Sequence, residues 1–452
     1  MAQCYHSQIA IAGRSLYDLI NRRAYLLAQG EVRVGRLHEL WAVPFVLTLV
    51  FALNSVSYAA SPSAYEPNLD LSNFALEHVP IPPAPTAASA KAKTAAGTSE
   101  ARTGAENAAS VLGASAYRGR QMNFGIATNL PAMTTPQLDA ALSNMKSMGV
   151  TWVRYDMNWA NIGSAGPGQY DWSNYDRVVS AVASYGLNSL PILDYTPTWA
   201  QDSACSGSQM CEPASASDFG QFAEAAASRY GPQGVRTWEI WNEPNISEFF
   251  QPAPDPGAYT ALLQSAYRGI KSVEGGATVL TAGLAPAATD GTDYAPPDFL
   301  NGIYAAGAHG YFDGVGDHPY TWPYLPSFYL EGNAWSQLTT LHDIMVDHGD
   351  GGKKIWITEY GAPTGGPGGE ASSGQTTAEG GDDHVTDGLQ ALMVTNAVDE
   401  ASSYPWVASF FWYNYIDDGT SADTVENFFG LLTPTGARKP AYYAYVAAIA
   451  SH

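Results

Sequence analysis

Two glutamates are the candidate reactive residues of this sequence, and each lies close to tryptophan or tyrosine near the end of an apolar run. Glu243 lies in the segment Trp238–Asn245 (WEIWNEPN), and Glu359 lies in Ile355–Gly361 (IWITEYG). Two carboxyl groups held roughly 5 Å apart can cleave an acetal by double displacement, because one protonates the leaving oxygen while the other attacks the carbon. The two glutamates are therefore the candidate acid/base and nucleophile.

A third carboxylate, Glu239, lies four residues before Glu243 in the same run. Four residues of an extended strand span about 13 Å. We therefore expect Glu239 to lie too deep to reach a substrate that contacts Glu243.

The predicted strands that carry these glutamates belong to a regular alternation of strands and helices. From residue 123 onward, eight β-branched or aromatic runs alternate with amphipathic runs of helical period. The expected strands are Asn123–Thr128, Thr151–Met157, Ser189–Tyr195, Val235–Asn242, Thr278–Leu284, Gly314–His318, Lys354–Glu359 and Val407–Asn414. This alternation is typical of βα units around a parallel sheet. Eight units favour a closed (β/α)8 TIM barrel, since a doubly wound open sheet normally uses fewer strands.

The active site of such a barrel forms at the C-terminal ends of its strands. Several polar residues occupy those ends and are expected to converge on one mouth. They are Asp156, Asn158, Asp194, Asn242, Glu243, His318, Glu359 and Asn414.

The two motifs carry a resemblance to a known group of enzymes. Trp-Asn-Glu-Pro-Asn at the fourth strand and Thr-Glu-Tyr-Gly at the seventh resemble the clan A glycoside hydrolases, particularly families 39 and 5. The resemblance implies that Glu243 is the acid/base and Glu359 the nucleophile. It also implies that Asn242 hydrogen-bonds the sugar hydroxyl next to the anomeric carbon. The choice between families 39 and 5 stays open.

Further residues match the clan pattern, and each has a structural alternative. Arg154 resembles the clan arginine whose charge keeps the nucleophile ionised, but it could instead pair with Glu239 inside the barrel. His318 and Tyr320 resemble the clan His-x-Tyr, whose tyrosine contacts the nucleophile, although His318 could be an ordinary hydrogen-bonded histidine. Trp412 resembles the tryptophan that floors the sugar subsite, and Trp199 is also expected near the mouth. Either tryptophan could be core packing.

The expected activity is hydrolysis of a β-linked poly- or oligosaccharide with retention. A transglycosylase would share the same covalent intermediate, and a non-catalytic glycan-binding protein of the cell wall could use the same barrel. The sugar, the linkage and the choice between endo- and exo-cleavage stay open. No cofactor is expected, and no metal site either, because no ligand spacing is visible.

The composition and net charge of the chain limit the kinds of molecule that it is expected to bind. Hydrophobic residues make up 46% of the chain, which is enough for a large core. The net charge of −22 argues against nucleic acid, since phosphate binding depends on clustered lysine and arginine. A polysaccharide or oligosaccharide is the expected partner, and the protein is expected to be a monomer.

The N-terminal part has a different composition from the rest. Residues 1–60 contain the apolar run 41–53 and are expected to be a signal peptide or a membrane anchor. Residues 61–117 are rich in Ala, Pro and Ser and are expected to be a disordered linker. The catalytic domain is expected over 118–452. The chain should therefore be secreted or displayed at the cell surface, with membrane attachment only through residues 41–60.

Cys205 and Cys211 form a close pair in a Gly- and Ser-rich segment. Export to an oxidising compartment would favour a disulfide between them, and two free thiols are the alternative.

If the leader is cleaved, the protein recovered from the culture medium should begin near Ala60, because small residues there suit signal peptidase. N-terminal sequencing of the secreted protein measures this. A mature chain that starts before Trp41 would contradict a cleaved signal.

Overall fold

The computed structural model describes residues 122–205, 207–328, 332–374 and 382–452. The predictions made for residues 1–60 and 61–117 lie outside the described residues. Among the described helices, none is both long enough and apolar enough to cross a bilayer.

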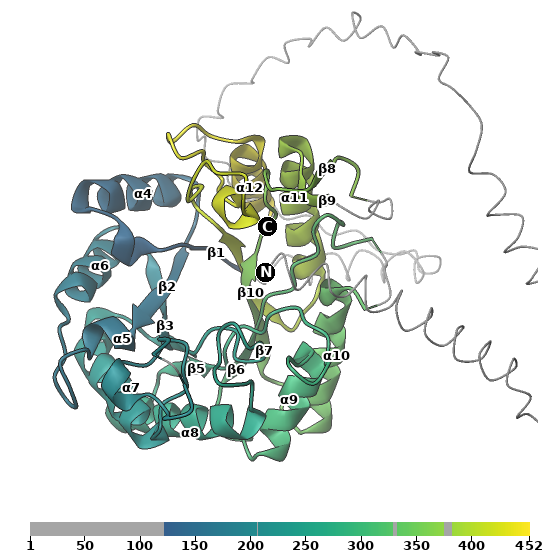
Figure 1. Ribbon diagram of the computed structural model, residues 1–452. Helices are drawn as coiled ribbons and strands as arrows, with labels where there is room; N and C mark the ends of the chain where they lie inside the picture. Colours follow the sequence, from purple (N-terminus) through teal and green to yellow (C-terminus); the bar gives the residue numbers. More distant parts are fainter. Residues whose placement is uncertain (1–121, 206, 329–331, 375–381) are drawn as a thin grey trace, which may run out of the picture. The chain divides into compact units, whose positions relative to one another are not determined.

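Eight parallel strands close into a barrel, which confirms the predicted (β/α)8 fold (Figure 1). Around the barrel the order is β1, β10, β7, β6, β5, β4, β3 and β2. The strands are β1 Asn123–Ala127, β2 Trp152–Asn158, β3 Asn188–Asp194, β4 Thr237–Ile240, β5 Thr278–Leu280, β6 Gly314–Asp317, β7 Lys354–Tyr360 and β10 Val407–Tyr413.

The helices lie outside the strands in Figure 1, as expected for this fold. They are α4 Thr135–Ser147, α5 Trp159–Ile162, α6 Ser173–Ser184, α7 Ala216–Tyr230, α8 Pro256–Val273, α9 Pro296–Ala305, α10 Ala334–Asp347, α11 Asp387–Ser403 and α12 Pro440–Ser451. Local sequence starts several of them. The side chain of Asp255 accepts from the backbone N–H groups of Gly257 and Ala258 at the start of α8, which satisfies donors that the helix leaves unpaired.

Two smaller features complete the described chain. After β7, β8 (Gly369–Ala371) and β9 (Asp382–Val385) form a two-stranded parallel sheet within a Gly-rich segment that gives no strand signal. After β3, Cys205 and Cys211 form a disulfide, as their spacing predicted.

The inward faces of the strands form layers. An apolar layer fills the barrel with Ala127, Leu190, Leu280, Trp356 and Phe411. Trp152 packs against this layer, and along β2 the alternating direction of side chains places Arg154 and then Asp156 above it. The floor is therefore apolar, and charged groups begin one step above it.

The fourth strand ends earlier than the sequence predicts. Trp241 and Glu243 adopt left-handed backbone conformations, with φ of 70° and 47°, so the regular ladder stops at Ile240. Asn242 keeps only an isolated bridge to Gly283. Non-glycine residues with positive φ carry strain that the surrounding structure must support, and here they redirect the side chain of Glu243.

The seventh strand carries a register irregularity opposite β10. Ile357 pairs with Phe410 and Tyr360 with Trp412, so Thr358 and Glu359 together lie opposite one residue. An extra residue of this kind re-aims side chains. As a result, both Thr358 and Glu359 hydrogen-bond inside the barrel, where strict alternation would send only one of them inward.

Gly125→Ala should destabilise the barrel, because a Cβ atom on Gly125 would lie 2.2 Å from the ring of Phe411. Overpacking of this kind costs about 1 to 3 kcal/mol. Gly276→Ala is the matched control, since a Cβ there meets no atom within 4 Å. Chemical denaturation of both variants measures the difference, and equal free energies of unfolding would contradict the packing argument.

Candidate active site

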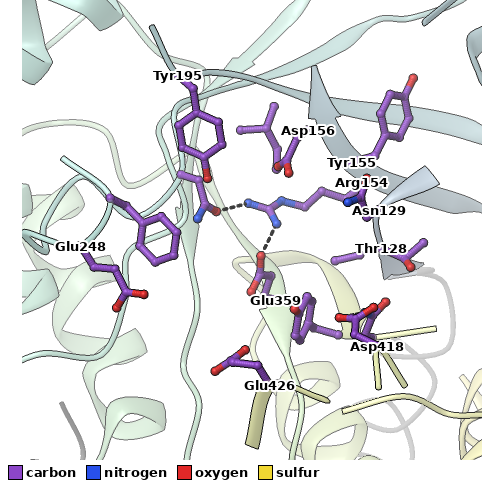
Figure 2. Close-up of a pocket in the computed structure, with 16 residues that line it drawn as sticks. Thr128, Asn129, Arg154, Tyr155, Asp156, Tyr195, Glu248, Glu359, Asp418 and Glu426 are labelled. Carbon is purple, nitrogen blue, oxygen red and sulfur yellow. Dashed lines mark hydrogen bonds and ion pairs between the residues drawn. The ribbon is translucent and has the colours of Figure 1, made fainter. Parts of the chain in front are cut away.

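Arg154 is the centre of the site. Its guanidinium is buried, and its Nε and Nη2 donate to Glu239 at 2.6 and 3.0 Å. Nη2 also donates to the Oδ1 of Asn242 at 2.9 Å, and Nη1 donates to Glu359 (Figure 2). Both roles considered for Arg154 are therefore present at once: it pairs with Glu239 and it contacts Glu359.

Glu359 has the surroundings of an ionised carboxylate. One oxygen accepts from Arg154, and the other accepts from the hydroxyl of Tyr320 at 2.6 Å. The Nδ1 atom of His318 lies 3.7 Å from that second oxygen. Burial by itself raises the pKa of Glu359, but His318, Arg154 and Tyr320 together outweigh burial and lower it.

Glu243 has the opposite character. Its side chain is fully buried, and its Oε1 lies 2.8 Å from the Nδ1 of His318. Its Oε2 has no hydrogen-bond partner among the described residues. Burial raises the pKa of Glu243; His318 opposes the rise and the charge of Glu359 adds to it. The two glutamates are thus biased toward different protonation states.

Oxygen atoms of Glu243 and Glu359 lie within 4.8 Å of each other. Carboxyl groups about 5 Å apart are typical of double displacement, whereas inversion needs about 6.5 to 9.5 Å to admit a water molecule. The separation therefore fits a nucleophile that attacks directly.

His318 has room beside Gly283, and Gly283 in turn packs closely against Gly316. A Cβ on Gly283 would lie 2.0 Å from the Nε2 of His318, and a Cβ on Gly316 would lie 2.8 Å from the backbone of Gly283. The Nε2 atom lies 3.1 Å from the hydroxyl of Thr358.

Glu243, His318 and Glu359 are close enough together to surround one metal ion. Their polar atoms are already used within the protein, however. The oxygens of Glu359 accept from Arg154 and Tyr320, and His318 bonds Glu243 and Thr358. We assign no metal to this group, because a cation would have to displace the guanidinium of Arg154.

A cavity of about 350 Å³ opens beside Glu359 at the C-terminal ends of the strands. Figure 2 shows acidic side chains around it. One of them is affected by this crowding: burial, together with the charges of Glu243, Glu359 and Glu248, raises the pKa of Glu426 to about 7. The cavity is lined by Ala127, Thr128, Asn129, Arg154, Tyr155, Asp156, Ile192, Tyr195, Asn242, Glu248, Phe249, Glu359, Tyr413, Asn414, Asp418 and Glu426.

The structure gathers most of the predicted site residues. Arg154, Asn242 and Glu359 line the cavity. Glu243 and His318 are fully buried beside it within the hydrogen-bonded network. Tyr320 is also fully buried and donates to Glu359.

Trp412 and Trp199 pack against other aromatic rings, and neither lines the cavity. Trp412 is fully buried, donates its Nε1–H to the carbonyl of Phe429 and packs against Tyr360. Trp199 donates to the carbonyl of Gly163 and packs edge-on against Trp159. Neither is among the described residues that line the cavity. Both side chains therefore pack against neighbouring rings, and contact with a sugar stays a prediction for each.

The aromatic residues that line the cavity are instead Tyr155, Tyr195, Phe249 and Tyr413. Along β10 the inward side chains alternate, so Phe411 in the apolar layer implies that Tyr413, and not Trp412, faces inward. That two-residue period was the available signal for Tyr413. No comparable signal pointed to Glu426, which lies in the 3₁₀ helix Val425–Phe428 within the connection from β10 to α12.

The chain is similar in sequence or in fold to several known glycoside hydrolases. The β-xylosidase of Caldicellulosiruptor saccharolyticus is 28% identical over 137 residues, which cover 27% of this chain and 27% of that protein. A family 39 glycoside hydrolase from Bacteroides cellulosilyticus WH2 has a TM-score of 0.58 at 23% identity, covering 74% of this chain and 64% of that chain. GH5_18 from Streptomyces cattleya, solved with GlcNAc, has a TM-score of 0.55 at 16% identity, covering 73% and 80%.

The chain spans about a quarter of that β-xylosidase and less than two thirds of the family 39 structure. At these identities the solved structures show the fold alone. The family comparison goes further: the model named Cellulase (glycosyl hydrolase family 5) matches residues 116–386, a range that contains Glu243 and Glu359. This match confirms the clan that the motifs indicated. Because it spans more than half of the sequence, the chain belongs to the cellulase family, glycosyl hydrolase family 5.

Proposed function

We propose that the chain is a retaining glycoside hydrolase in which Glu359 is the nucleophile and Glu243 the general acid/base. The observation that carries this proposal is the pair of facing carboxyl groups within 4.8 Å, one with a lowered and one with a raised pKa. Environments that separate the pKa values of two neighbouring carboxyl groups are how such sites assign the base and the acid.

In the first step, Glu359 attacks the anomeric carbon while Arg154 and Tyr320 hold its carboxylate in place. Glu243 protonates the leaving oxygen through Oε2, which has no hydrogen-bond partner among the described residues. In the second step, Glu243 accepts a proton from water, and the hydroxide attacks the same carbon and releases Glu359. Asn242, held by Arg154, lines the cavity where it can bond a sugar hydroxyl.

We propose a β-linked poly- or oligosaccharide of neutral sugars as the substrate. Asp156, Glu248, Asp418 and Glu426 line the cavity, and Arg154, the one cation among its lining residues, is already paired with carboxylates. A uronate would meet like charge in a partly buried space, which is unfavourable. The family name and the β-xylosidase relative support a neutral β-linked substrate.

We also propose that the enzyme acts outside the cytoplasm. The disulfide between Cys205 and Cys211 supports export, because disulfides persist mainly in oxidising compartments.

Glu359→Ala should abolish turnover of aryl β-glycosides, because no covalent intermediate can form. Glu243→Ala should lower turnover by about 10²- to 10⁴-fold, the usual contribution of a general acid, and added azide should restore part of it. A panel of aryl β-glycosides and plain polysaccharides measures both variants, with an aryl β-glucuronide as the anionic comparison.

The controls for that panel are the wild-type protein and Thr260→Val, which removes a buried hydroxyl on α8. Product analysis with an added oligosaccharide acceptor separates hydrolysis from transglycosylation. A wild-type protein that binds one glycan but cleaves none would contradict the proposal and favour a glycan-binding role.

Tyr320→Phe should move the acidic limb of the pH–rate profile to higher pH. The hydroxyl of Tyr320 donates to Glu359 and lowers its pKa, so removing it raises the pH at which the nucleophile becomes ionised. A hydrogen bond to a charged group corresponds to a shift of about one pH unit. Profiles of kcat/KM measure the shift, and an unchanged acidic limb would contradict this role of Tyr320.

A further inference from the structure

Glu239 is a buried carboxylate that the proposed chemistry does not use. Its side chain is fully buried and accepts hydrogen bonds from four donors. They are Nε and Nη2 of Arg154, the backbone N–H of Gly283 at 2.8 Å and the hydroxyl of Thr358 at 3.2 Å. Since every contact is a donor, Glu239 acts only as an acceptor.

This arrangement fixes the direction of the next hydrogen bond. Thr358 has one hydroxyl hydrogen, which it gives to Glu239. The oxygen of Thr358 must then accept from the Nε2 of His318, 3.1 Å away. Nε2 of His318 therefore carries a hydrogen.

The other ring nitrogen faces the two catalytic carboxyl groups. Nδ1 of His318 lies 2.8 Å from Oε1 of Glu243 and 3.7 Å from Oε2 of Glu359. If Nδ1 had no hydrogen, Glu243 would have to place its proton on Oε1 to complete the bond. Oε2, which has no hydrogen-bond partner among the described residues, would then lack the proton that the reaction needs. With a hydrogen on Nδ1, the acid proton stays on Oε2.

We propose that Glu239, acting through Thr358, holds His318 as a doubly protonated cation that compensates the negative charge as it passes between Glu359 and Glu243. The proposal rests on the catalytic roles given above. Glu239 and Thr358 are positioning residues in it, since neither lines the cavity.

The charges balance at each stage. Before attack, Glu359 is the anion and Glu243 is neutral. After attack, Glu359 is bound to the sugar as a neutral ester, and Glu243 has become the anion by giving its proton to the leaving oxygen. His318 lies within 4 Å of both carboxyl groups, so a single fixed cation stabilises either state.

The surroundings of His318 support a cation. Burial lowers its pKa, but the charge of Glu359 and the bond to Glu243 outweigh burial, and the net pKa is raised. Arg154 on β2 opposes the rise. The remaining charged groups are Asp317 on β6 itself, whose pKa burial raises to about 8, and Glu239 behind Thr358.

The test compares Thr358→Val with Thr358→Ser. Valine has a similar volume but removes the acceptor for Nε2–H, which disfavours the cation; serine keeps the hydroxyl. In Thr358→Val the alkaline limb of the kcat profile should move to lower pH by about one unit, and turnover at neutral pH should fall about tenfold. Thr358→Ser should restore the wild-type profile. Thr260→Val, which removes a buried hydroxyl on α8, is the control and should change neither.

A second readout does not depend on activity. The ¹⁵N shifts of labelled histidine, assigned with His318→Gln, should show both nitrogens of His318 protonated at about pH 7 in the wild-type protein and a neutral ring in Thr358→Val. A neutral His318 in the wild-type protein, or matching profiles for the valine and serine variants, would overturn the proposal. If the wild-type protein cleaves no glycoside, the catalytic roles fail, and the ¹⁵N shifts still decide whether Glu239 holds a charged His318.

Discussion

Arg154 connects three strands of the barrel through its side-chain hydrogen bonds. Its buried guanidinium hydrogen-bonds Glu239 and Asn242 from the β4 segment and Glu359 from β7. Trp152, on the same strand β2, packs against the apolar layer below. Removing a guanidinium from water costs several kcal/mol, and only well-placed acceptors offset that cost. Losing one partner of a buried ion pair typically destabilises by about 3 to 5 kcal/mol. The same contacts that offset the cost of burying Arg154 therefore fix the position of Glu359, so one side chain links stability and site geometry.

The two glutamates proposed as catalytic differ in environment more than in burial. Both are buried, so desolvation acts on each in the same direction. Arg154 and Tyr320 contact only Glu359 of the two, and His318 stands between them. A difference in protonation then follows from how many donors each carboxyl group meets. In the proposed cycle the negative charge moves from Glu359 to Glu243. A cation that contacts both carboxyl groups, such as His318, therefore suits the cycle better than a cation that contacts only one.

Local irregularities bring these groups together. Positive φ at Trp241 and Glu243 ends β4 early, and the extra residue in β7 turns both Thr358 and Glu359 inward. A regular barrel would point alternate residues away from its axis. The strain at Glu243 is supported by backbone bonds, since its N–H donates to Gly283 and its carbonyl accepts from Ile246. Departures from regular geometry concentrate where the chemistry is proposed.

The eight-unit barrel and the strands that carry Glu243 and Glu359 can be predicted from the sequence alone, because hydrophobic periodicity and the two motifs are local properties. Period-two alternation also contained the information that Tyr413 faces inward. The folded structure was needed to show how Trp412 packs, that Glu426 lines the cavity and that Glu239 joins the network. These depend on barrel closure and on a bulge, which bring together residues distant in sequence through contacts that local periodicity does not encode.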